Sequence, residues 1–191
     1  MSLKSRLIEI LRSGETSRIR FSFTGTSGSQ VTVDRSSFRR VATALENEDI
    51  SIVENRFTTD IAMYSSRADS SSNSAANTFY FGRNNRASRL FNALVIHESV
   101  HASFDLTRTT IPWVDNEAAA YIAQGYYARN SGLPRLAFEF GSQAIIGYQI
   151  VTNMRSENQS DVDFFLDALR DSLHASPQYH DYIRGTFTGD G

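Results

Sequence analysis

Hydrophobic positions in the first 85 residues switch between helical and strand spacing. Leucine and isoleucine recur at helical spacing between Ser2 and Gly14, and a second helical pattern follows Asp34 and ends near Asn47. Between these helices, apolar positions alternate over residues 18–24 and resume after a turn rich in glycine and serine, which predicts a β-hairpin. Three more short strands are predicted, at residues 50–53, 59–64 and 78–81.

Longer patterns follow, and nearly all of them have helical spacing. The first runs from residue 86 to residue 106, and Asn85 or Ser88 can cap its start. The later elements predicted are a turn containing Pro112, helices at residues 115–132, 136–155 and from Ser160 onward, and a frayed tail beyond Gly185. The helix at residues 136–155 is apolar enough to be central.

Residues 65–77 differ from the rest of the chain in composition. They consist almost entirely of Ser, Asn, Ala, Asp and Arg, which cannot bury enough apolar surface to offset the entropy of ordering. We expect a mobile loop here, either a lid or, more simply, a linker.

Composition narrows the class of protein. A chain of 191 residues with 40% hydrophobic content can form one core, so we expect a single α+β domain over residues 1–191, with a sheet-bearing part at 1–85 and a helical part at 86–191. A net charge of −2 argues against nucleic-acid binding. No segment resembles a signal peptide or a membrane span, so the chain is expected to be soluble, in the cytoplasm or secreted by a route without a recognisable signal. Oligomeric state stays open.

The chain contains no cysteine, which leaves histidine and carboxylate side chains as its strong metal ligands. His97-Glu98-Ser99-Val100-His101 lies within the helix predicted at residues 86–106. Residues four apart share a helix face, so both imidazoles can reach one ion, while Glu98 lies about 100° further round. This pattern predicts a Zn²⁺ site with Glu98 beside it as general base; the alternative is a coincidence on a surface helix.

Two histidines do not complete a catalytic zinc site, which usually has three protein ligands. Glu117 is the leading candidate, because a helix, a tight turn and a second helix can return it to the histidine pair. Its other interpretation is an acidic residue favoured at a helix N-terminus by the helix dipole. Asp105, one turn beyond His101, is the alternative third ligand, although we favour a supporting role in which it accepts a hydrogen bond from the distal nitrogen of a ligand histidine.

The segment His97-Glu-Ser-Val-His-Ala-Ser-Phe-Asp105, followed by Asn116-Glu117-Ala118, resembles the gluzincin metallopeptidases, the thermolysin-like HExxH branch of the zincins, in a minimal bacterial form. The resemblance covers about 30 residues. It implies a zincin-like fold, zinc held by His97, His101 and Glu117, and Glu98 as general base. It also implies a supporting position for Asn116. The chain departs from thermolysin in its shorter interval before Glu117 and in having Tyr121 one turn after it.

The expected function is a zinc metallopeptidase that hydrolyses peptide bonds with a metal-activated water. We expect an extended peptide or protein substrate to pair with residues 79–81 as an edge strand. Tyr121 is the candidate for stabilising the oxyanion, and the other candidates lie in the C-terminal stretch, at His174, Tyr179 and His180. Two alternatives stay open: a protease toxin or effector with one protein target, and a catalytically silent zincin-like metal-binding interaction module.

Overall fold

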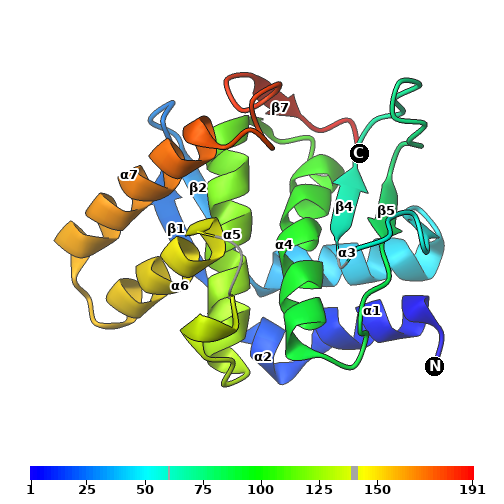
Figure 1. Cartoon of the computed structure of the whole chain (residues 1–191), viewed down its shortest axis with the longest axis horizontal. Coiled ribbons are helices and arrows are strands. Elements are labelled where there is room, and N and C mark those ends of the chain that lie inside the picture. The colour runs from blue at the N-terminus through cyan, green and yellow to red at the C-terminus, as the bar shows by residue number, and fades with distance from the viewer. Residues whose placement is uncertain (60, 139–141) are drawn as a thin grey trace.

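The computed structural model describes residues 1–59, 61–138 and 142–191 and has a mixed α+β architecture (Figure 1). Its helices are α1 (Leu3–Arg12), α2 (Gly14–Ser17), α3 (Arg35–Asn47), α4 (Arg89–Leu106), α5 (Trp113–Asn130), α6 (Ser142–Arg155) and α7 (Gln159–Ala175), with a 3₁₀ turn at Arg135–Ala137. Its strands are β1 (Phe21–Thr24), β2 (Gln30–Val33), β3 (Ser51–Val53), β4 (Ala62–Ser65), β5 (Thr78–Phe81), β6 (Thr110–Pro112) and β7 (Thr186–Thr188).

The N-terminal helices and hairpin are confirmed. Ser2 caps α1 through its side chain, and Asp34 forms a capping box with Ser37 at the start of α3. β1 and β2 pair antiparallel and bury Phe21 and Phe23 on one face. The short helix α2 was not predicted. It begins directly after α1 because the Ser13 side chain acts as its N-cap and accepts a hydrogen bond from the Thr16 backbone N–H.

The three-stranded sheet has the order β3-β5-β4, which corrects one expectation. β5 pairs with β3 in parallel and with β4 antiparallel, so residues 79–81 have no free edge for a substrate. All four side chains of β5 are buried, as is typical of a central strand. The pattern of residues 78–81 predicts a strand but does not reveal which strands pair with it. The edge strand that lies beside α4 is β4.

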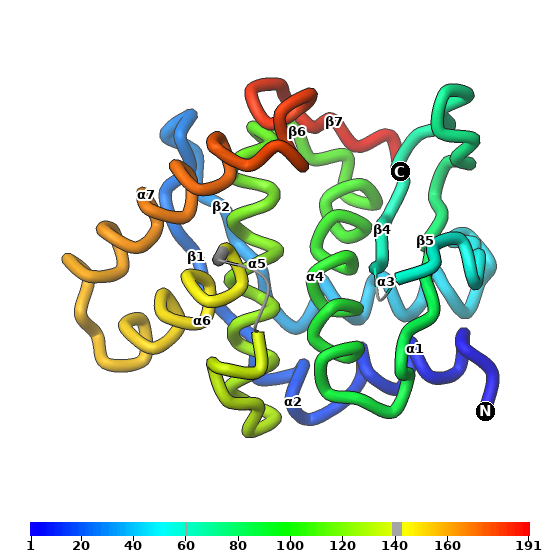
Figure 2. Tube along the Cα trace, in the orientation of Figure 1, coloured from blue at the N-terminus to red at the C-terminus, as the bar shows by residue number. Residues whose placement is uncertain are grey.

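Helices α4 and α5 lie side by side at the centre of the molecule, as Figures 1 and 2 show. Ser88, one of the two predicted caps, caps α4, which begins at Arg89 and not near residue 86. α5 begins at Trp113, two residues before the predicted start. The helix predicted at residues 136–155 begins only at Ser142, after the 3₁₀ turn; residues 139–141 lie outside the described part. It is not central but packs between α5 and α7, with Ile145 and Ile146 only partly buried.

The prediction that the tail beyond Gly185 frays is wrong. β7 pairs antiparallel with β6, and Phe187 is buried in register with Ile111. Strands of three residues are too short to show an alternating apolar pattern, so the sequence does not reveal them. They exist because they pair with each other, and in this pairing Ile111 and Phe187 are partners 76 positions apart.

Residues 65–77 contain a closed turn, in which the backbones of Asp69 and Ser74 form a reciprocal pair of hydrogen bonds. The Ser72 and Ser71 hydroxyls donate to the Asp69 carboxylate and lower its pKa to about 2. Serine and aspartate therefore order this turn locally, without a hydrophobic core. Separately, no helix in the described ranges is long and apolar enough to cross a membrane.

Gly147→Ala is expected to destabilise the protein, although alanine is the better helix former. A β-carbon on Gly147 of α6 would lie 2.4 Å from the Tyr121 carbonyl oxygen of α5. Helix propensity alone predicts a gain of about 1 kcal/mol, whereas overpacking costs about 1–3 kcal/mol, so urea unfolding should show a net loss. Gly14→Ala is the control, because a β-carbon there meets nothing within 4 Å. If Gly147→Ala has the same free energy of unfolding as wild type, α5 and α6 can move apart at this contact without a loss of stability.

Candidate metal centre

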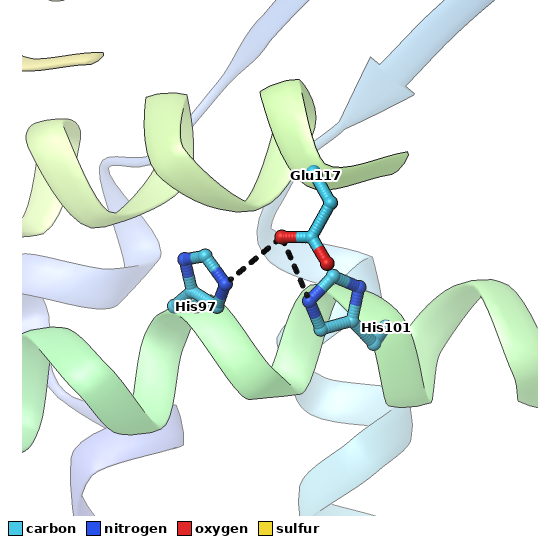
Figure 3. Close-up of side chains that lie close together, drawn as sticks. All are labelled: His97, His101 and Glu117. Atoms are coloured by element: carbon cyan, nitrogen blue, oxygen red, sulfur yellow. Dashed lines mark ion pairs between the residues drawn. The ribbon is translucent and has the colours of Figure 1, made fainter. Parts of the chain in front are cut away.

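The two central helices bring three potential ligands together. His97 and His101 lie one turn apart on α4, and Glu117 faces them from the first turns of α5 (Figure 3). Glu117 Oε2 lies 3.5 Å from His97 Nε2 and 3.8 Å from His101 Nε2. One ligand atom from each residue lies within 4.8 Å of the others. The structure therefore assembles the predicted ligand set.

These separations fit a bound metal ion. Ligands arranged tetrahedrally at about 2.0–2.2 Å from zinc lie roughly 3.3–3.6 Å from one another. The 3.5 Å and 3.8 Å separations from Glu117 Oε2 are close to this range, and every separation in the set is within 4.8 Å. The side chains of His97, His101 and Glu117 are only 5–8% exposed, and among the described residues only these two imidazoles lie near the buried Glu117 Oε2 as ion-pair partners. A buried anionic oxygen that faces two imidazole nitrogens is well suited to binding a cation.

The electrostatics of the cluster keep the Glu117 carboxylate charged. Burial alone would raise the pKa of Glu117, but the His101 and His97 side chains outweigh it, so the net direction is downward. Burial likewise opposes protonation of His97, yet Glu117 and Glu98 raise its pKa above the usual range. The site thus offers an ionised oxygen before any cation arrives.

Glu98 follows His97 on α4 but lies outside the ligand set. Its Oε2 accepts a 2.8 Å hydrogen bond from the backbone N–H of Tyr64 on β4. Burial raises the pKa of Glu98, against the opposing effect of His97 and His101. A buried carboxylate with a raised pKa, next to the ligands, has the properties of a general base.

Asn116 contacts the candidate ligand His101. Its Oδ1 lies 2.7 Å from His101 Nδ1, an arrangement in which Nδ1 carries the proton and Nε2 is left free to bind a metal. Within the described part of the chain His97 Nδ1 has no comparable acceptor, although the Gln124 side chain is one of the groups that raise the pKa of His97. Asn116 therefore has the position that fixes a tautomer, as the resemblance implied.

Asp105 does not bind a histidine, which corrects its expected role. Its carboxylate is fully buried and accepts from the Tyr64 hydroxyl at 2.7 Å and from the Asp190 backbone N–H at 3.0 Å. Four residues turn a helix by about 400°, so Asp105 is rotated by roughly 40° from His101 and lies one turn further along. Its neighbours are therefore β4 and the C-terminal residues, not α5.

Asp115 links the start of α5 to the β1–β2 hairpin and to α7, and thereby positions Glu117. This carboxylate is fully buried and accepts from the backbone and side chain of Thr26, in the hairpin turn, at 2.7 and 2.6 Å. Arg170 of α7 donates to its other oxygen at 2.9 Å. Removal of either partner from a buried pair leaves an uncompensated charge, so this contact strongly restrains the end of α5.

Three tyrosines lie over the cluster. The Tyr121 ring contacts the His97 ring edge-on, with centroids 4.5 Å apart, and its hydroxyl lies 2.5 Å from that of Tyr179. Tyr182 donates to Glu117 Oε1 at 3.1 Å. The sequence did not predict this role for Tyr182, whose one signal was its place in the same polar C-terminal stretch as Tyr179. His174 and His180, the other candidates there, are exposed and lie outside the cluster.

Asn116→Ala should weaken zinc binding by roughly 10–100-fold, because His101 loses the partner that fixes its tautomer. Asn116→Asp keeps an acceptor and should retain most of the affinity, measured by competition with a chelating dye. Asn92→Ala is the control on α4, since the buried Asn92 amide donates to the Tyr127 hydroxyl away from the cluster. Equal affinity in Asn116→Ala and Asn92→Ala would contradict the assigned role.

No family model matches the chain, and the searches of curated proteins and of solved structures gave no match. The function is therefore inferred from the chemistry of the site. The feature that bears on it most directly is the convergence of His97, His101 and Glu117, with Glu98 beside them.

Proposed function

We propose that the protein is a zinc-dependent metallopeptidase of the gluzincin type, with a zincin-like arrangement of its sheet and paired helices. One observation carries the proposal: two imidazoles and one carboxylate converge, while a second buried carboxylate, Glu98, stays outside the donor set. Structural zinc sites usually have four protein ligands and need no base. A set of three ligands beside a base is typical of catalytic sites.

The chemistry divides between the metal and the chain. Zinc, when bound, polarises a substrate carbonyl and lowers the pKa of a coordinated water towards ~7. Glu98 accepts the proton of the attacking water and returns it to the leaving amine. Burial raises the pKa of Glu98, which brings its proton affinity closer to that needed near neutral pH. The Tyr64 N–H restrains this carboxylate beside the ligands.

The edge strand β4 replaces residues 79–81 as the proposed substrate-binding strand. The Gly82 N–H donates to the Ile61 carbonyl, just before β4 and just after β5. Along an antiparallel strand, the backbone groups of successive residues point alternately towards and away from the neighbouring strand, so those of Ala62 and Tyr64 point away from β5. Glu98 uses the Tyr64 N–H, which leaves the Tyr64 carbonyl and the Ala62 backbone for an extended peptide. Strand addition holds a peptide without reading its sequence.

Tyr121 remains the proposed donor for the oxyanion. Its hydroxyl and that of Tyr179 share one hydrogen bond, so one of the two keeps a free O–H. Burial raises the pKa of Tyr121, and the Glu117 and Glu98 charges add to this effect. The phenol therefore stays protonated at neutral pH, and when Tyr179 donates the shared hydrogen bond, the Tyr121 O–H is available as a donor beside His97.

Glu117→Gln should lose zinc binding, whereas Asp105→Asn should keep most of it. The two changes are chemically matched, but only Glu117 faces the imidazoles, while Asp105 binds Tyr64. Wild type at zinc concentrations of 100 times Kd should gain about 2.7 kcal/mol of stability, and Glu117→Gln should show no such gain in thermal unfolding. Loss of zinc in Asp105→Asn alone would reassign the third ligand.

Glu98→Gln should keep zinc and lose peptide cleavage by about 10²–10⁴-fold, because it removes the proton acceptor. The assay is cleavage of a peptide library by zinc-loaded protein, read by mass spectrometry. Glu9→Gln, at an exposed glutamate of α1, is the control for the same chemical change.

The same assay separates the alternatives. Absence of stoichiometric zinc binding by the wild type would end the peptidase proposal. Zinc binding without cleavage of any peptide or protein would favour a silent interaction module. Cleavage of one protein, with none of a general substrate such as casein, would favour a toxin or effector.

A further inference from the structure

Residues 176–191, here called the strap, run from the end of α7 across the ends of α5 and α4 (Figure 1). The strap is held by its backbone. β7 pairs with β6, and the Trp113 N–H donates to the Gly185 carbonyl at 3.1 Å. At its far end, the Asp190 N–H donates to the buried Asp105 carboxylate. The strap therefore docks on both helices that supply metal ligands.

One side chain of the strap reaches the metal ligands directly. The Tyr182 hydroxyl donates to Glu117 Oε1 at 3.1 Å, and the Tyr182 ring packs edge-on against Trp113 with centroids 4.7 Å apart. Trp113 in turn lies beside His101, at 6.4 Å between ring centroids. The phenol is thus fixed at both its ring and its hydroxyl.

This contact makes the two oxygens of Glu117 different. Oε1 accepts from Tyr182, whereas Oε2 faces the imidazoles, 3.5 Å from His97 Nε2 and 3.8 Å from His101 Nε2. A free carboxylate can rotate and present either oxygen or both. A carboxylate that is held at one oxygen presents the other to the ion.

We propose that Tyr182 is a positioning residue of the metal centre, which orients Glu117 as a one-oxygen ligand and thereby couples metal affinity to docking of the strap. The proposal rests on the metal site proposed above and adds to it a residue 65 positions after Glu117. Coupling of this kind is reciprocal: if the docked strap tightens zinc binding, zinc must favour the docked strap by the same factor.

The first test compares two tyrosines of the strap. Tyr182→Phe should raise the zinc Kd by roughly 10–100-fold, because only the bond to Glu117 is lost. Tyr179→Phe is matched in chemistry and location, but its hydroxyl contacts Tyr121 and not Glu117, so its zinc Kd should stay near that of wild type. The absorption spectrum of the cobalt-substituted protein should change in Tyr182→Phe alone. Equal Kd and equal spectra in the two variants would overturn the proposal.

A second test leaves the fold intact, because it compares two states of one chain. Thr110 and Thr188 are exposed and directly opposed in the β6–β7 pair. Hydrogen bonds join the pairs 109/189 and 113/185, so 110/188 is a non-hydrogen-bonded pair, with about 4.5 Å between Cα atoms, which suits a disulfide. The natural chain has no cysteine to interfere.

In the variant Thr110→Cys/Thr188→Cys, the oxidised form should release zinc to excess chelator roughly tenfold more slowly than the form reduced and alkylated at both thiols. Adding Tyr182→Phe to the oxidised variant should abolish the slowing. Release at equal rates from both forms, or slowing that persists without the Tyr182 hydroxyl, would overturn the proposal. Failure of wild type to bind zinc would instead refute the proposed function, so the two outcomes are distinguishable.

Discussion

The close contact between α4 and α5 is the constraint on which the site depends. A glutamate side chain is short, so Glu117 reaches both imidazole nitrogens only if the two helix backbones lie close together. The residues after Glu117 are small: Ala120, three positions on and on the same helix face as Glu117, is fully buried and adds little bulk there. Asp115 then anchors the start of α5 to the hairpin and α7. Packing and chemistry are therefore set by the same few residues.

Elements that repeat an apolar pattern over ten or more residues could be predicted from the sequence with their caps, as α1, α3 and α4 show. Elements defined by a distant partner could not. β6 and β7 are three residues each and exist as a pair, and the apolar content around residues 136–155 does not reveal that the helix begins at Ser142. The central place of β5 also depends on β3 and β4, which lie far from it in the chain.

The candidate site shows the same division. The pairing of His97 with His101 follows from helix geometry alone, whereas Glu117 required the added assumption of a helix hairpin. The roles of Asp105 and Asn116 depend on which neighbour each side chain faces. On α4, His101 contacts Asn116 of α5, whereas Asp105, one turn further along, contacts Tyr64 of β4. Tyr182 comes from a segment with no periodicity to place it. Sequence patterns thus locate ligands better than the residues that orient them.

The strap has a consequence for the order in which the site assembles. All three candidate ligands lie within 21 consecutive positions, from His97 to Glu117, on two helices joined by a short connection. Contacts that are close in sequence form fastest, because they close small loops, so the α4–α5 hairpin can gather its ligands early in folding. The side-chain hydrogen bonds between the strap and helices α4 and α5 span 58 to 85 positions and close later. An ion bound by the hairpin would therefore meet the Tyr182 hydroxyl only after the three side chains had gathered.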